Sequence, residues 1–304
     1  MASPQLQNII QMLKARRIRG DASYQEIRAA FEQIAAIYPI DANVSRQKDD
    51  TNGVSGEWIT SPGVSGETTI FYIHGGGWTI GSVNTHARLT ALIGAAADAR
   101  VFSIDYRLAP EHPYPAGLDD CITAYRWLIE DQAVDPGRLV IAGDSAGGNL
   151  TLATLLRLRD EGYPLPAAAV CLSPATDILA TGESHTTRRE ADPMLGGTPD
   201  GINKVREAYC PGQDPKNPYI SPLYGDPSGL PPLLIQVGDA EILLDDAVRF
   251  AQLATESGVD VTLEVWDEMI HVFQFFAPML PEGVEAINTV GKFIKSQIGA
   301  ISAA

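Results

Sequence analysis

The stretch RLVIAGDSAGGNL, residues Arg138 to Leu150, joins a short apolar run to a serine set among glycines. Leu139 to Ala142 predicts a buried strand, because a short run of apolar residues bounded by turn residues is typical of a strand covered on both faces. Ser145 follows between small residues, and an amphipathic helical pattern begins at Ala146. Strand, sharp turn and helix in this order form the setting in which G-x-S-x-G makes a nucleophile elbow.

An ordinary helix start is the alternative interpretation of this glycine-rich turn, with Asp144 or Ser145 acting only as the N-terminal cap. The elbow interpretation accounts for the glycines, since a strained backbone at the central residue leaves no space for bulky neighbours. It also presents the serine hydroxyl beyond the sheet, beside the N–H groups that begin the helix. Ser145 is therefore the candidate nucleophile.

The composition of the chain is that of an ordinary folded protein. Its 304 residues are 45% hydrophobic and 20% charged, which suits a large core and about two domains. The net charge of −16 argues against nucleic-acid or membrane-surface binding, because both partners would repel the chain. The sequence has no apolar run of about 18 residues and no apolar stretch typical of a signal peptide, so a cytoplasmic location is expected by default.

The three cysteines, Cys121, Cys171 and Cys210, lie far apart in the sequence. Their spacing matches neither a zinc site nor a disulfide framework. They are expected to be reduced and partly buried, and no metal site is predicted.

Apolar strands alternate with amphipathic helices along most of the chain, which predicts a mainly parallel sheet with helices on both faces. Strands are expected at Thr69–His74, Val101–Ile104, Leu139–Ala142, Ala167–Leu172, Leu233–Val237 and Val261–Val265, with a shorter one at Trp58 and Ile59. Helices are expected after Ser145, at Pro115–Glu130, from about Leu243 and at Pro281–Ile298.

Two segments interrupt this alternation. Residues 1 to about 40 carry helical patterns, and residues 179–230 are rich in proline, glycine and charge, with one helical pattern at Ile202–Tyr209. Because a long insertion in a compact domain is usually a lid or a binding segment, we expect both to cap the carboxyl edge of the sheet. The expected division is an N-terminal cap part at 1–45, an inserted cap part at 181–214, and a catalytic domain at 46–180 and 215–304.

A serine hydroxyl is a weak nucleophile at pH 7 and needs a base, which a carboxylate in turn orients. Among the five histidines, His271 is the best candidate because it follows the last predicted strand. Loops at the carboxyl ends of parallel strands meet at one edge of a sheet, and Ser145 lies at such an end. The alternative is a loop histidine packed under aromatic residues such as Phe273.

The acid is expected after the preceding strand, in LLIQVGDAEILLDDA, residues 233–247. Asp245 and Asp246 fall in the first turn of a predicted helix, where acidic side chains suit the helix dipole. Asp239 and Glu241 remain, and because both follow the strand closely, residue chemistry alone leaves the choice between them open.

The segment HGGGW, residues His74 to Trp78, follows another predicted strand. Its glycines allow the backbone to approach a reacting carbonyl and to direct N–H groups at it, as in the oxyanion hole of lipases and esterases. A phosphate-binding loop is the alternative, but the chain lacks the lysine and the helix start that such loops carry. His74 itself is expected to have a structural role.

HGGGW, DYRLAPEHPYPA at residues 105–116 and GDSAGGNL at residues 143–150 occur together and in this order. In this combination the chain resembles the bacterial hormone-sensitive-lipase-like esterases from about His74 to His271. The resemblance implies the α/β-hydrolase fold, with a mostly parallel central sheet, helices on both faces and a helical cap. It also implies that the oxyanion hole consists of the N–H groups of Gly76, Gly77 and Ala146.

The acid segment of that family reads acid-Pro-Leu-x-Asp-Glu, thirty residues before the histidine. Here EILLDD matches it, with Glu241 thirty residues before His271, so the resemblance favours Glu241 over Asp239. The sequence departs from the family in having glutamate without the following proline. For Arg107 in DYRLAPEHPYPA we favour a structural role, held by Asp119 or Asp120 and bracing the glycine loop.

The resemblance implies hydrolysis of short-chain acyl esters through an acyl-enzyme, with Ser145, His271 and Glu241 as the triad. A small-molecule ester is the expected partner, with no metal, no organic cofactor, no nucleic acid and no membrane, and a homodimer is one possibility. An amidase or lactonase of the same fold is the alternative. A non-catalytic receptor is disfavoured because receptors of similar fold have lost the triad histidine, which His271 provides here.

Overall fold

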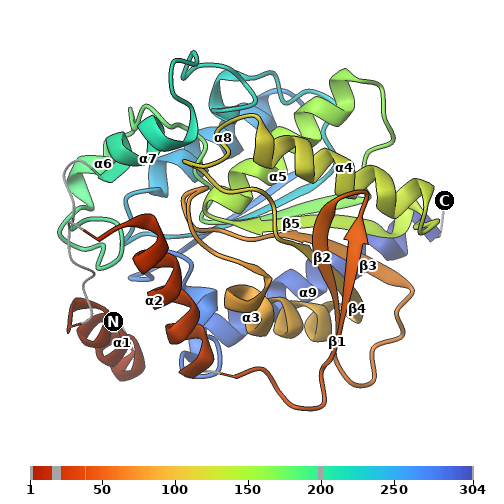
Figure 1. The fold of residues 1–304 in the computed structure, drawn as a ribbon, viewed down its shortest axis with the longest axis horizontal. Coiled ribbons are helices and arrows are strands. Elements are labelled where there is room, and N and C mark those ends of the chain that lie inside the picture. Colours follow the sequence, from red (N-terminus) through yellow and green to blue (C-terminus); the bar gives the residue numbers. More distant parts are fainter. Residues whose placement is uncertain (1–2, 16–21, 38, 198–200, 303–304) are drawn as a thin grey trace.

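A central eight-stranded sheet organises the computed structural model, which describes residues 3–15, 22–37, 39–197 and 201–302. The predicted cap segments 1–45 and 181–214 therefore include residues outside the described ranges. The strands lie in the order β1-β2-β4-β3-β5-β6-β7-β8, and Figure 1 shows the sheet in the middle of the molecule, between helices. All pairs from β4 to β8 are parallel, and β1 and β2 join them as an antiparallel hairpin. The predicted, mostly parallel sheet is confirmed.

The strands are β1 (Ser45–Thr51), β2 (Val54–Thr60), β3 (Thr68–Ile73), β4 (Ala99–Ile104), β5 (Leu139–Asp144), β6 (Ala168–Leu172), β7 (Leu233–Gly238) and β8 (Val261–Trp266). The helices are α1 (Pro4–Ala15), α2 (Tyr24–Ile37), α3 (Val83–Ala97), α4 (Ala116–Glu130), α5 (Ala146–Asp160), α6 (Ser184–Thr187), α7 (Gly201–Tyr209), α8 (Leu244–Glu256) and α9 (Pro281–Ser302). Short 3-10 turns lie at Pro136–Arg138, Pro222–Tyr224 and Phe273–Phe276.

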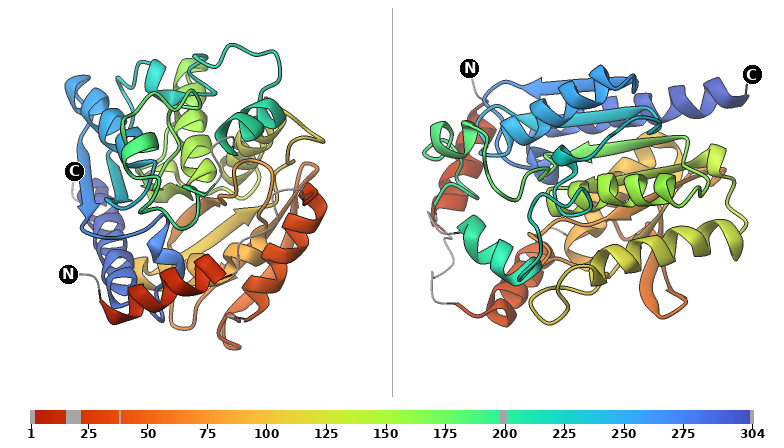
Figure 2. Two further views of the ribbon diagram at one scale, coloured as in Figure 1. Left: turned by 90° about the vertical axis from the view of Figure 1, so that its left-hand side faces the viewer. Right: turned by 90° about the horizontal axis from the view of Figure 1, so that it is seen from above.

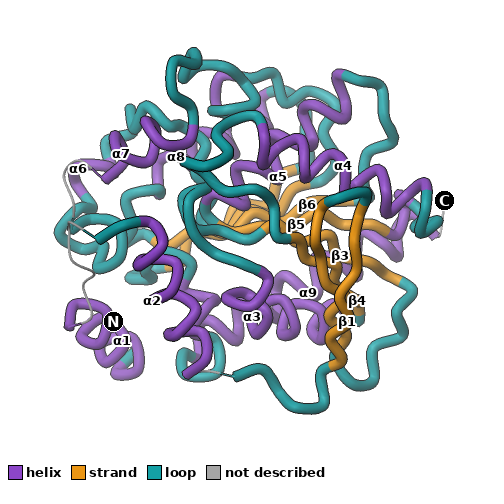
Figure 3. Tube along the Cα trace, viewed as in Figure 1, coloured by secondary structure: helices purple, strands orange, loops and turns teal. Residues whose placement is uncertain are grey.

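Helices cover both faces of the sheet, as the sequence predicts (Figure 3). Successive side chains of a strand point to opposite faces, and in β3 this sends Phe71 and Ile73 to one core and Ile70 and Tyr72 to the other. Helices α4, α5 and α8 pack on the first core, and α3 and α9 pack on the second. Because both faces are covered, the inner parallel strands β3 to β7 are largely apolar, whereas the edge strand β8 is only partly buried and includes Thr262 and Glu264.

Two elements depart from the sequence-based expectation. The short strand expected at Trp58 and Ile59 is one part of a seven-residue strand, β2, and its partner β1 was not predicted. The sequence of β1, SRQKDDT, is polar because this edge strand is largely exposed. Helix α3 was also missed. Most of its residues are buried, so it lacks the one-sided apolar pattern that marks an amphipathic helix.

The segments expected to form the cap lie at one end of the sheet, where Figure 2 shows α1 and α2 near α6 and α7. In α2, Arg28 binds the carbonyl oxygen of Thr79 at 2.7 Å, in the loop after β3. In α7, Tyr209 stacks on Trp78 of the same loop with ring centroids 4.4 Å apart. Both segments therefore rest on the glycine loop. Among the described residues, no helix has the length and apolar character needed to cross a membrane.

Candidate active site

Ser145 occupies the sharp turn between β5 and α5. Its backbone has φ 53° and ψ −118°, a conformation that costs a non-glycine residue about 1–3 kcal/mol. The turn is tight on both sides: a Cβ on Gly147 would lie 2.0 Å from the carbonyl oxygen of Ile73, and one on Gly143 would lie 2.4 Å from that of Gly147. The alternative interpretation as an ordinary capped helix fails, since Ser145 makes no side-chain capping bond and the carboxylate of Asp144 accepts hydrogen bonds from Tyr72 and Gly75 instead.

The imidazole of His271 lies between a hydroxyl and a carboxylate. Its Nε2 is 3.0 Å from Ser145 Oγ, and its Nδ1 is 2.6 Å from Glu241 Oε2. Glu241 is fully buried and His271 is only 4% exposed, so bulk water is excluded from the imidazole–carboxylate contact. The three side chains come from loops after β5, β7 and β8, and the fold brings them into one hydrogen-bonded series.

The structure separates the two candidate acids, between which residue chemistry alone left the choice open and the resemblance favoured Glu241. Asp239 points to the β8 side of its loop, where its Oδ1 accepts the N–H of Glu268 at 2.7 Å. Glu241 Oε1 instead accepts two hydrogen bonds, from Ser173 Oγ at 2.7 Å and from the N–H of Gly238 at 2.8 Å. These two donors leave Oε2 for the histidine.

Ser173 is a residue that sequence reasoning missed. Its hydroxyl donates to Glu241 and accepts the N–H of Val272 at 3.2 Å, so it connects the acid to the residue after His271. It directly follows β6. The signal that marks the other site residues, a polar side chain at the carboxyl end of a parallel strand, could therefore have identified it.

Charge and burial act in opposite directions on His271. Burial alone would lower the pKa of this imidazole, but the charge of Glu241 and its hydrogen bond outweigh burial, with smaller contributions from Asp192 and Asp144. The pKa of His271 is therefore raised above its usual 6.5. A carboxylate that stabilises the protonated ring also favours proton transfer from the serine to the ring.

The glycine loop after β3 supplies N–H groups beside the serine. Gly76 and Gly77 adopt φ 121° and 57°, values that favour glycine. Within the part of the chain that the structure describes, the N–H groups of Gly76, Gly77 and Ala146 donate to no other group. Unpaired donors of this kind can hold an oxyanion.

The remaining predictions concern the frame of the site. Arg107 pairs with Asp120 at 2.7 Å, which confirms one of its two expected partners, while Asp119 pairs with Arg157. His74 is buried, and its Nδ1 lies 2.8 Å from the carbonyl oxygen of Gly75. Burial is the main reason why its pKa falls to about 3, so His74 stays neutral at pH 7.

Asp245 and Asp246 lie in the first turn of α8, as expected. Asp246 does more than face the helix dipole. Its carboxylate accepts the N–H groups of Thr176 and Asp177 at 2.8 Å each, and it lies 2.7 Å from Nε2 of His185. This buried pair joins α6 to α8 immediately after the Glu241 loop.

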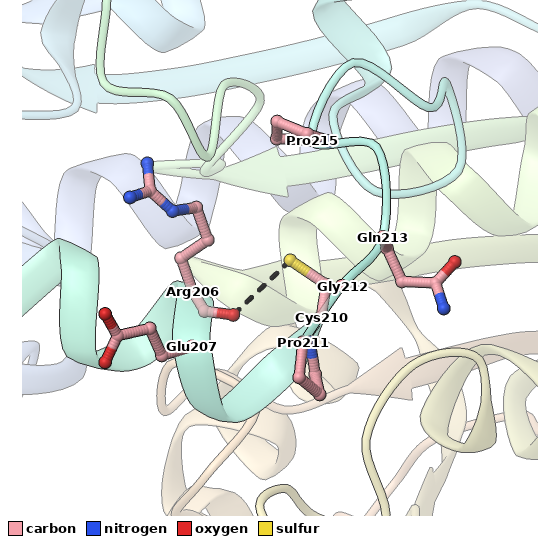
Figure 4. A pocket seen from close by; sticks show the side chains of 7 residues that line it. All are labelled: Arg206, Glu207, Cys210, Pro211, Gly212, Gln213 and Pro215. Atoms are coloured by element: carbon pink, nitrogen blue, oxygen red, sulfur yellow. Dashed lines mark hydrogen bonds between the residues drawn. The ribbon is translucent and has the colours of Figure 1, made fainter.

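No cluster of metal-ligating side chains occurs within the described ranges. The cysteines are free, as expected, and all three are buried rather than partly buried. A hollow of about 160 Å³ lies at the end of α7, beside Arg206, Cys210 and Pro215 (Figure 4). A larger groove of about 590 Å³ lies between α2, α3 and Pro278. Neither is lined by Ser145, Glu241 or His271.

Residues 70–275 match the model of a protein family described as having the α/β hydrolase fold. An acetyl-hydrolase of Streptomyces hygroscopicus is 41% identical over 302 residues, which cover 98% of this chain and 99% of that protein. The crystal structure of an esterase from the bacterial hormone-sensitive lipase family is 45% identical, with a TM-score of 0.94, and covers 98% of this chain and 99% of that chain. The chain is also similar to EstE5 in a crystal soaked with p-nitrophenyl butyrate. The two sequences are 42% identical, the TM-score is 0.93, and the match covers 98% of this chain and 100% of that chain.

Proposed function

We propose a catalytic mechanism from the premise that this chain belongs to the α/β hydrolase fold family and is a carboxylic ester hydrolase of its hormone-sensitive-lipase group. In this proposal, Ser145, His271 and Glu241 carry out the hydrolysis. The observation that carries the proposal is the unbroken series of contacts from Ser145 Oγ through His271 to Glu241, at 3.0 and 2.6 Å. A triad for nucleophilic catalysis is recognised by this geometry, in which a nucleophile, a base and an orienting acid lie within hydrogen-bond distance of one another in series.

In the first half of the reaction, Ser145 Oγ attacks the ester carbonyl while His271 Nε2 takes the hydroxyl proton. Glu241 keeps the ring oriented through Nδ1 and stabilises its cationic form. The carbonyl oxygen becomes an oxyanion that accepts the N–H groups of Gly76, Gly77 and Ala146. Each such donor is worth about 2.7–4 kcal/mol of transition-state stabilisation. His271 then protonates the departing alcohol, which leaves an acyl-Ser145 ester.

In the second half, water attacks the acyl-enzyme and His271 takes a proton from it. The new oxyanion uses the same N–H groups, and its collapse expels Ser145 Oγ, which recovers its proton from His271. Bonds and protons therefore balance with water as the only co-reactant, and the chemistry uses no metal and no organic cofactor.

We further propose that the acyl group is short. This is supported by the acetyl-hydrolase and by the butyrate ester in which the EstE5 crystal was soaked, and by the cap segments that rest on the glycine loop.

On p-nitrophenyl esters of graded acyl length, kcat/KM should peak at acetate or butyrate and fall at least about tenfold by octanoate. This fall equals a loss of about 1.4 kcal/mol of transition-state stabilisation. A stopped or continuous assay of p-nitrophenol release measures kcat/KM for each ester. A peak at octanoate or longer contradicts short-chain preference, and turnover of anilides alone favours the amidase alternative.

The pH profile follows from the raised pKa of His271. The ring acts as a base only when it is neutral, so activity is lost as the pH falls through this pKa. The acid limb of kcat/KM should therefore have its midpoint above pH 6.5, the usual value for histidine. A midpoint below 6.5 contradicts the dominance of Glu241 over burial.

A cytoplasmic location and a homodimer stay predictions. The dimer is supported by β8, which among the described strands pairs only with β7 and leaves Val265 47% exposed. An exposed strand edge is a template for pairing with another chain.

A further inference from the structure

A further carboxylate–imidazole pair lies beneath the glycine loop, separate from the triad and from the pair of Asp246 and His185. Asp144 is 3% exposed and His86, from α3, is 2% exposed. Asp144 Oδ2 lies 3.3 Å from His86 Nε2, and Asp144 Oδ1 accepts the hydroxyl of Tyr72 at 2.7 Å. The proposed mechanism uses none of these three side chains.

Asp144 connects the two parts of the proposed oxyanion hole. Its Oδ1 also accepts the N–H of Gly75 at 3.1 Å, one residue before Gly76. In the other direction along the chain, Asp144 ends β5 and directly precedes Ser145. The contact is close: a Cβ on Gly75 would lie 2.2 Å from Asp144 Oδ2. One carboxylate therefore sets the distance between the glycine loop and the nucleophile elbow.

The surroundings of Asp144 stabilise its charged form. Burial would raise the pKa of Asp144, but the facing imidazole of His86 and the hydroxyl of Tyr72 outweigh burial and lower it. Burial and Asp144 raise the pKa of Tyr72 well above its usual value, so the phenol keeps the proton it donates. A buried carboxylate that lost one of these donors would be left under-solvated and would shift to find another.

His86 is held at both ring nitrogens. While Nε2 faces Asp144, Nδ1 lies 2.8 Å from Thr85 Oγ1 and 3.3 Å from the carbonyl oxygen of Ser82. Phe31 of α2 and Phe275 pack against the ring in edge-to-face arrangements, with centroid distances of 5.9 and 5.4 Å. The imidazole therefore has little freedom, which makes it a fixed support for Asp144.

We propose that Tyr72 and His86 are positioning residues: they hold Asp144 so that this carboxylate sets the glycine loop against Ser145, and the buried network thereby controls stabilisation of the oxyanion without touching the substrate. This inference rests on the proposed function, because it requires Gly76, Gly77 and Ala146 to be the oxyanion donors.

Removing one oxygen from Tyr72 tests the network. In Tyr72→Phe, Asp144 loses a donor and the glycine loop shifts, so kcat for p-nitrophenyl butyrate should fall about 10- to 100-fold, with KM within about threefold. Tyr125→Phe is the matched control, since Tyr125 is equally buried and its hydroxyl donates at 2.9 Å to the carbonyl oxygen of Pro164, away from the loop. The control should keep kcat within about threefold.

A transition-state analogue separates positioning from a general loss of structure. A trifluoromethyl ketone with a butyrate-like chain forms a hemiketal oxyanion on the serine, so its Ki should rise in Tyr72→Phe by the factor by which kcat/KM falls. The Ki should not change in Tyr125→Phe. An unchanged Ki in Tyr72→Phe, or equal effects in the two variants, overturns the inference.

Two substitutions of His86 decide the matter if Tyr72→Phe does not fold. His86→Leu should lower kcat as Tyr72→Phe does, and His86→Gln, whose amide N–H reaches towards Asp144, should restore most of that loss. Equal activities of these two variants count against the inference.

Ser145→Ala is measured in the same series and separates the two proposals. Activity retained in Ser145→Ala contradicts the proposed function. If Ser145→Ala is inert and Tyr72→Phe is unaffected, only the proposed role of the network is contradicted.

Discussion

Ser145→Ala should lower kcat on p-nitrophenyl butyrate by about 10⁵- to 10⁶-fold, because loss of a triad nucleophile costs about as much as loss of the whole triad. The variant removes the hydroxyl oxygen that lies 3.0 Å from His271 Nε2 and that attacks the ester in the proposed mechanism. Alanine keeps the Cβ of serine, so the strained backbone at φ 53° is equally strained in the variant. The melting temperature should therefore change by no more than a few degrees.

Two measurements accompany this prediction. A fluorophosphonate should label the unsubstituted protein on the peptide that contains Ser145 and should fail to label the variant, as read by mass spectrometry. Ser296→Ala serves as the control, since that hydroxyl binds a carbonyl within α9 on an exposed face and its loss should leave kcat within about twofold. Hydrolysis at more than about a hundredth of the original kcat in Ser145→Ala contradicts its role as nucleophile.

Glu241→Gln should lower kcat by about 10³- to 10⁴-fold, as expected when a neutral amide replaces the acid that orients the triad histidine. Gln keeps the size of the buried side chain, but it removes the charge that raises the pKa of His271. The acid limb of the residual activity should consequently move to lower pH, since burial then acts on the imidazole with little opposition. Steady-state kinetics across the pH range measure both effects.

Asp239→Asn is the matched control for the acid. Its side chain accepts the N–H of Glu268 at 2.7 Å, and the amide oxygen of asparagine can accept the same bond. We expect kcat within about threefold and an unchanged pH profile. If Asp239→Asn costs more than Glu241→Gln, the role of the acid passes to Asp239.

Local patterns were sufficient wherever a feature depends on neighbours in the chain. The strand, tight turn and helix around Ser145 follow from an apolar run, small residues and a helical period, and the structure has β5 and α5 there. The glycine loop follows from HGGG in the same way. Strand β1 and helix α3 were missed for different reasons. Strand β1 has a polar sequence and is ordered by pairing with β2, of which only Trp58 and Ile59 were predicted. Helix α3 is buried by elements distant in sequence, so its residues do not show a one-sided apolar pattern.

The sequence by itself determined which residue types end which strands, and thus that a serine, a histidine and an acid belong to one edge of the sheet. Only the tertiary structure decided which acid contacts the histidine, because Asp239 and Glu241 are chemically alike and differ in their hydrogen-bond donors. Asp239 accepts the N–H of Glu268 in the loop after β8, whereas Glu241 accepts the hydroxyl of Ser173. The same holds for the Asp144, His86 and Tyr72 network. Its members lie on separate elements, and contacts of that kind arise from packing across the core, which no local pattern encodes.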